Sequence, residues 1–153
     1  MRVLLTVLVG GALVLSSPVR SSGSEACAGE ATKALVRSFV SGYAAGRVRA
    51  IDRMVAPAPR FHWFSAGPPQ ARLGAPSHER STLARYFRAR IREHERIRIV
   101  RLGAGYDSHR RIVNFGGQLI RSADDIRPRR GPTAFKGAAD CVIGRPAFIV
   151  WSM

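Results

Sequence analysis

The hydrophobic positions follow a helical period in the first half of the chain and strand-like patterns afterwards. From residue 31 to residue 45, apolar side chains recur at spacings of one, three and four, which predicts a helix with one buried face. That face consists of Leu35, Val36, Phe39, Val40 and Tyr43. Gly46 can end this helix, and a short second helix is predicted over residues 48–55. Pro57 then closes the second helix, because proline cannot continue one.

The pattern changes at residues 60–65, which are short and rich in aromatic side chains, as a strand would be. Residues 71–73 can give a brief returning strand. Ser81 and Thr82 are good helix N-caps and precede a third helix, in which apolar side chains recur every four residues. Its inward positions are Leu83, Phe87 and Ile91, with Tyr86, Arg90 and His94 on the adjoining stripe. Its predicted solvated side carries Arg85, Arg88, Arg92, Glu93, Glu95 and Arg96.

The rest of the chain predicts an antiparallel meander of four strands separated by turn-rich segments. The strands are expected at residues 97–106, 111–122, 133–143 and 147–153. Gly103, Gly105, Gly116 and Gly117 lie inside the first two of these strands, and interior glycines usually mark bulges or bends in a curved sheet. We therefore expect an α+β fold in which three helices from the first half pack on a strongly curved, mostly antiparallel sheet.

The first 26 residues are typical of an export signal. Arg2 is followed by an apolar run over residues 3–15 and by a small, polar segment beginning at Ser16. Cleavage could follow this segment or occur after Ala26, which would leave residues 27–153 as a single exported domain. Cys27 also raises lipid attachment as an alternative, although the residue three places earlier is not apolar.

Two cysteines, Cys27 and Cys141, are the only ones in the chain. In an oxidising compartment such an isolated pair is interpreted first as one disulfide, which would join the start of the mature domain to a late strand. The alternative is two free thiols in the core.

The 153-residue chain has a formal charge of +15, and nearly all of its 25 basic residues are arginine. Codon bias can produce such an excess. The charge still favours contact with anionic envelope polymers or lipid surfaces. The basic residues are dispersed and no aromatic-interleaved motif accompanies them, so specific nucleic-acid binding is not expected.

The order of elements resembles the nuclear transport factor 2-like superfamily, which includes SnoaL-like cyclases and ketosteroid isomerases. The resemblance spans about residues 31–153, and its carriers are residues 35–43, 51–55, 61–64 and 149–153. It implies a cone lined by the inner face of the sheet and by the first helix, with a mouth for a small apolar molecule. It also implies that a homodimer could form through the outer face of the sheet.

Four residues are candidates for lining the cone: Tyr43, Trp63, Asn114 and Gln118. Asn114 and Gln118 share strand parity. The first two could equally be core side chains, and the last two would face solvent if the parity were inverted.

Enzymes of this fold use a carboxylate inside an apolar cone together with a tyrosine or an acid. No position in the sequence matches that pair. Candidate catalytic residues are therefore limited to Asp140, the one acid inside a predicted late strand, to His62, and to Tyr43 as a hydrogen-bond donor. The four histidines share no metal-ligand spacing, and no motif calls for a cofactor.

Three functions follow as competing hypotheses. The leading one is an exported, non-catalytic domain that binds a small apolar or amphipathic ligand in its cone, or an envelope partner on its surface. The second is an isomerase, cyclase or hydrolase on the same scaffold. The third is a cationic envelope-associated protein without a ligand pocket.

Overall fold

The fold is described by a computed structural model that covers residues 29–65, 80–124, 131–142 and 144–153. The predicted export signal, Cys27 and the predicted returning strand at residues 71–73 lie outside these ranges. The described elements are α1 (Gly29–Ala44), α2 (Val48–Asp52), β1 (Trp63–Ser65), α3 (Arg80–Arg92), β2 (Arg96–Asp107), β3 (Ile112–Ser122), β4 (Thr133–Val142) and β5 (Arg145–Ser152).

The strands form one sheet in the order β1-β5-β4-β3-β2. From β2 to β5 each strand pairs antiparallel with the next, which confirms the predicted meander. β1 instead lies parallel to β5, with Trp63 opposite Val150. This parallel pairing was not predicted, because a three-residue strand carries no signal about its partner.

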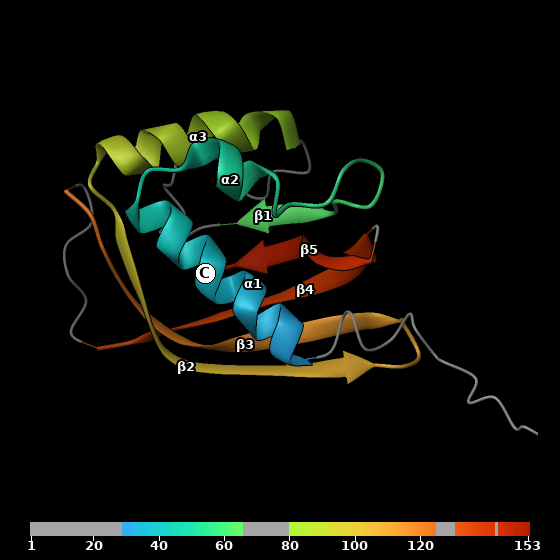
Figure 1. The fold of residues 1–153 in the computed structure, drawn as a ribbon. Coiled ribbons are helices and arrows are strands. Elements are labelled where there is room, and N and C mark those ends of the chain that lie inside the picture. Colours follow the sequence, from blue (N-terminus) through green and yellow to red (C-terminus); the bar gives the residue numbers. More distant parts are fainter. Residues whose placement is uncertain (1–28, 66–79, 125–130, 143) are drawn as a thin grey trace, which may run out of the picture.

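The sheet bends sharply along β2 and β3. The start of β2 rises toward α3 in Figure 1, and the remainder runs along the lower edge of the sheet. The register between the two strands shifts between Ile99 and Arg101. Gly117 lies opposite this irregularity, where a Cβ atom would stand 2.0 Å from the Arg101 carbonyl oxygen. Only glycine fits so close an approach, as the prediction of bends at interior glycines requires.

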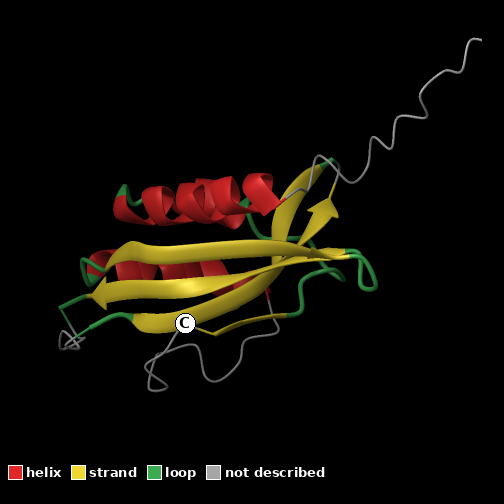
Figure 2. Cartoon of the chain, turned by 90° about the horizontal axis from the view of Figure 1, so that it is seen from below, coloured by secondary structure: helices red, strands yellow, loops and turns green. Residues whose placement is uncertain are grey.

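The three helices lie on one face of the sheet, with α1 crossing over β2 (Figure 1). Seen from below, one helix lies above the strands and another lies behind them, and no described helix lies on the lower side of the sheet (Figure 2). The predicted fold class is thereby confirmed.

Between the two layers lies an aromatic core. Phe39 and Trp151 have ring centroids 4.7 Å apart, and Phe87 packs edge-on against Phe39, Tyr43 and Phe64. All five side chains are almost fully buried. Burial of one such side chain stabilises the fold by about 1.5–3 kcal/mol, so this core holds the helices to the sheet.

Candidate functional site

A charged cluster lies buried among these aromatic side chains. The carboxylate of Glu95 has no solvent exposure. One of its oxygens, Oε2, accepts hydrogen bonds from Arg90 Nε at 2.5 Å, from Arg121 Nη2 at 3.2 Å and from the Tyr43 hydroxyl at 3.3 Å. The other oxygen accepts from Arg121 Nε. Arg121 Nη2 also donates to the Tyr86 hydroxyl at 3.2 Å. We call these five residues the Glu95 cluster.

The cluster forms because segments that are far apart in the sequence meet at the bent end of the sheet. Arg90 occupies the last turn of α3, Glu95 directly precedes β2, and Arg121 lies on β3 opposite Ile97. A buried charge is costly unless it is paired and hydrogen-bonded. The four donors to Glu95 therefore tie α1, α3, β2 and β3 into one arrangement.

The tyrosines of the cluster are donors and not bases. Burial raises the pKa of Tyr43 well above its usual value, and the neighbouring Tyr86 and Glu95 raise it further. Burial likewise raises the pKa of Tyr86, although Arg121 opposes this shift. Both hydroxyls consequently keep their protons across the physiological range.

Glu95 corrects one expectation from the sequence, which placed this residue on the solvated side of the third helix. α3 ends at Arg92, so Glu95 no longer follows the helical period and its side chain turns into the core. An acid beside a tyrosine inside the fold was therefore not predicted from the sequence. The signal that could have found it is the stripe of Tyr86 and Arg90, which predicts a polar partner at the inner end of α3.

Asn114 and Gln118 correct a second expectation, because neither lies inside the cone. Asn114 is paired with Ala138, and Gln118 with Ala134, on the sheet face away from the helices. Both side chains are exposed, whereas the intervening Phe115 and the following Leu119 are buried. The parity of the strand was therefore inverted in the prediction.

The remaining candidates separate in space. Tyr43 is a core residue held by Glu95, and Trp63 lies in β1, where its side chain is not described. Asp140 points away from the core, where it accepts a hydrogen bond from Arg60 at 2.7 Å and another from the Cys141 amide at 2.6 Å. It is thus the partner of an arginine, and not an acid in the cone. His62 lies on the sheet face away from Tyr43, so the two cannot act on one substrate atom.

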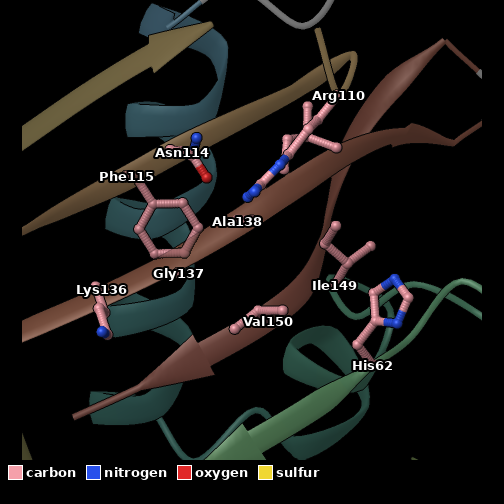
Figure 3. A pocket seen from close by; sticks show the side chains of 10 residues that line it. His62, Arg110, Asn114, Phe115, Lys136, Gly137, Ala138, Ile149 and Val150 are labelled. Carbon is pink, nitrogen blue, oxygen red and sulfur yellow. The ribbon is translucent and has the colours of Figure 1, made fainter. Parts of the chain in front are cut away.

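The sheet face opposite the helices carries an open groove of about 610 Å³, drawn in Figure 3. Ligand sites of proteins commonly have volumes of about 300–1,000 Å³. The apolar part of the lining is formed by the side chains of Ile112, Ala138, Ile149 and Val150. The polar part comes from His62, Arg110, Asn114 and Lys136. We call this region the sheet-face groove.

Local structure places each polar side chain at this groove. The Asp107 carboxylate accepts hydrogen bonds from the amides of His109 and Arg110, which fixes the turn that carries Arg110. Lys136 stands opposite Gly116, which has no side chain to cover it. The His62 amide donates to the Ile149 carbonyl at 2.9 Å, which holds the histidine beside β5.

The groove is electrostatically one-sided. Neither Arg110 nor Lys136 forms an ion pair with another described residue, and no acid is among the lining residues. An apolar floor beside two unpaired cations suits a ligand with an apolar body and an anionic end.

Other chemistry has less support within the part of the chain that the structure describes. No three His, Cys, Asp or Glu side chains there lie close enough together to hold a metal ion. Cys141 is disulfide-bonded. Because Cys27 lies outside the described ranges, the predicted pairing of these two cysteines stays a prediction. None of the described helices has the length and apolar character needed to cross a membrane.

Comparison with known proteins identifies the fold alone. No family model and no curated protein sequence matches the chain. Among solved structures, a protein of unknown function with a cystatin-like fold from Nostoc punctiforme has a TM-score of 0.60 at 11% identity, covering 80% of this chain and 86% of its own. A nuclear transport factor 2-like protein with a cystatin-like fold from Novosphingobium aromaticivorans has a TM-score of 0.60 at 8% identity. The match covers 80% of this chain and 78% of that protein.

A candidate scytalone dehydratase from Novosphingobium aromaticivorans has a TM-score of 0.62 at 8% identity, with 80% of each chain covered. These matches, together with the helices on one face of a bent antiparallel sheet, define a protein of the nuclear transport factor 2-like, cystatin-like fold. The resemblance stated from the sequence is therefore confirmed at the level of fold.

Proposed function

We propose that the protein is a non-catalytic binding domain that holds a small amphipathic anion in the sheet-face groove. The observation that carries this proposal is the one-sided lining of the groove, with apolar side chains beside Arg110 and Lys136 and no acid among the described residues that line it. The site thus differs from the cone interior expected from the sequence.

A second copy of the chain is a weaker candidate for the same surface. A two-fold dimer places the same patch of both subunits face to face. Such a dimer through the groove would bring Arg110 and Lys136 close to the same cations of the other copy. Like charges across an interface oppose association, which favours an anionic ligand over a homodimer.

Binding of dodecanoate, measured by isothermal titration calorimetry, tests the proposal. We expect dodecanoate to bind and the neutral dodecanol and the cationic dodecyltrimethylammonium to bind more weakly. Lys136→Met, which removes the charge and keeps an apolar stem, should weaken dodecanoate about three- to fivefold, as for a partly exposed ion pair. Ala138→Phe should block the floor of the groove. Arg98→Gln is the matched control, since Arg98 is exposed outside the groove.

Binding that is insensitive to both Lys136→Met and Ala138→Phe would place the ligand elsewhere. Analytical ultracentrifugation of the same proteins distinguishes a homodimer from a ligand site. A dimer that Ala138→Phe dissociates would assign the groove to a second copy of the chain.

An enzyme on the same scaffold is the second candidate, and one contact favours it. Tyr43 and Glu95 form an acid and tyrosine pair inside the fold. Against this role, both Glu95 oxygens already accept hydrogen bonds from arginine, whereas a general base needs a free lone pair aimed at its substrate. Exchange of the α-protons of 2-heptanone in heavy water, followed by NMR, discriminates the two. Exchange that Glu95→Gln abolishes, in a variant shown by circular dichroism to remain folded, would support the enzyme.

We also propose that the domain functions after export, with Cys27 and Cys141 joined. The signal-like residues 1–26 and the absence of a free thiol at Cys141 support this. The intact mass of protein recovered from the culture medium or cell envelope tests it. We expect residues 27–153 less two hydrogens, or a slightly longer chain cut after Ser16 or Ser17. A full-length mass with titratable thiols would contradict the proposal.

A further inference from the structure

Five arginines surround the connection between α1 and α2, and none of them forms an ion pair with an acid of the described residues. Arg37 and Arg47 line one cleft of about 380 Å³, together with Ser38, Ser41, Gly42, Ala50 and Met54. Arg85, Arg88 and Arg92 line a second cleft of about 400 Å³, together with Gly46, Val48 and Ile91. We call these the first and second arginine clefts.

The two clefts are neighbours. Gly42 and Arg47 line the first, and Gly46 and Val48, from the same short segment, line the second. The segment is held by its own backbone, since the Arg47 amide donates to the Gly42 carbonyl at 2.9 Å. A chain-like ligand could therefore pass over this segment from one cleft to the other.

All five arginines are exposed, and none forms an ion pair or a hydrogen bond with another residue of the described ranges. Asp52, the acid of α2, is already bound by Arg80. On α3, Arg85, Arg88 and Arg92 are spaced by three and four residues and so repel one another along one helix face. No ion pair with an acid of the described residues offsets this repulsion, and a bound anion would relieve it.

The guanidinium group binds phosphate through a planar pair of N–H donors. In the first cleft, the hydroxyls of Ser38 and Ser41 can add further donors. Recessed clefts admit the phosphates of a flexible strand more readily than a flat bilayer. The described side chains that are large, apolar and exposed, Val100 and Tyr106, both lie on β2 and not on the helices. The helical layer thus lacks the aromatic platforms on which nucleic-acid bases stack.

We propose that the two arginine clefts bind a linear phosphate polymer that carries no bases, with successive phosphates in each cleft. This surface is separate from the sheet-face groove, which lies on the opposite face of the sheet. The two arginine clefts would thus be the site at which part of the positive charge of the chain binds a ligand.

Binding of fluorescently labelled inorganic polyphosphate to the full chain, measured by anisotropy at several salt concentrations, tests the proposal. Two double variants test one cleft each: Arg37→Gln with Arg47→Gln removes both arginines of the first, and Arg88→Gln with Arg92→Gln removes two of the three arginines of the second. We expect each to weaken polyphosphate binding about tenfold and to lower the slope of log affinity against log salt by about two. Arg98→Gln with Arg101→Gln removes the same charge from exposed positions on β2 and should weaken binding less than about threefold.

Two further probes distinguish other partners. Single-stranded DNA with the same number of phosphates and vesicles of phosphatidylglycerol should both bind more weakly than polyphosphate. Equal loss in the control variant would reduce the interaction to net charge and overturn the proposal. Equal or tighter binding of DNA or of vesicles would also overturn it, in favour of a nucleic acid or a membrane. Thermal unfolding of each variant confirms that it is folded.

Discussion

Helix α3 carries arginines in two opposite environments. Arg90 is 3% exposed and its Nε donates to Glu95, whereas Arg85, Arg88 and Arg92 lie in solvent around the second arginine cleft. The residue type and the helix are the same. The difference teaches that the arginine content of this chain serves two separate purposes, one inside the fold and one at its surface.

Solvent explains the contrast. In the interior, a guanidinium must be matched by an acceptor because it has lost its hydration. Burial opposes the charge of Arg121, but its hydrogen bond to Glu95 and its neighbours raise its pKa above the ordinary value. At the surface, water and salt screen each charge, so an unpaired arginine costs little and remains available to a ligand.

The largest effect on stability is expected from Glu95→Gln, which removes the acceptor of the buried arginines. The variant removes the buried carboxylate that Arg90 and Arg121 share, which should lower the free energy of unfolding by about 3–5 kcal/mol. Urea unfolding at neutral pH measures the loss. Glu30→Gln is the control, because Glu30 is an exposed acid paired with Lys33, and it should change stability by less than about 0.5 kcal/mol.

A Glu95→Gln variant as stable as the Glu30→Gln control would show that the Glu95 cluster is not needed for folding. That result would favour the second candidate function, an enzyme, because a buried carboxylate that does not stabilise the fold would require another explanation.

The sequence predicted the elements of this fold because their signals are local. Residues 31–45 and 111–122 show the periods of a helix and a strand without reference to any other segment. The exposed positions of Arg85, Arg88 and Arg92 also followed from helical period alone.

The candidate sites could not be predicted in the same way, because they depend on contacts between distant segments. In the Glu95 cluster, one hydrogen bond joins residues that are 52 positions apart. The sheet-face groove needs the turn at Arg110 beside β4 and β5. Strand parity was the weakest step of the prediction. An error of one position in β3 assigned Asn114 and Gln118 to the inner face of the sheet, whereas both lie on the outer face.

An intermediate effect is expected from the tyrosines of the cluster at alkaline pH. The pKa of Tyr43 is raised in the folded protein above its ordinary value of 10.0, so the folded state keeps a proton that the unfolded state loses. The stability contribution is complete below pH 10 and falls as pH rises further, by up to about 1.4 kcal/mol per pH unit for each tyrosine.

Urea unfolding between pH 9 and pH 11 measures this slope. Tyr43→Phe should make the decline shallower, because it removes one of the two shifted groups. Tyr106→Phe is the matched control, since Tyr106 is exposed and lies in β2, and it should leave the slope unchanged. Identical slopes in all three proteins would contradict the assignment of the alkaline loss to the cluster.

The smallest effect, and one of opposite sign, is expected from Arg88→Gln. Arg88 lies three residues from Arg85 and four from Arg92, so its removal relieves two repulsions on the exposed face of α3. Each is worth about 0.2–0.5 kcal/mol, and glutamine has nearly the helix propensity of arginine. The variant should therefore gain up to about 1 kcal/mol at low salt and lose this gain at high salt. Arg98→Gln, on β2, should show no such gain. A fall in stability after Arg88→Gln would mean that this arginine is already compensated within the fold, and the contrast between the buried and the exposed arginines of α3 would then disappear.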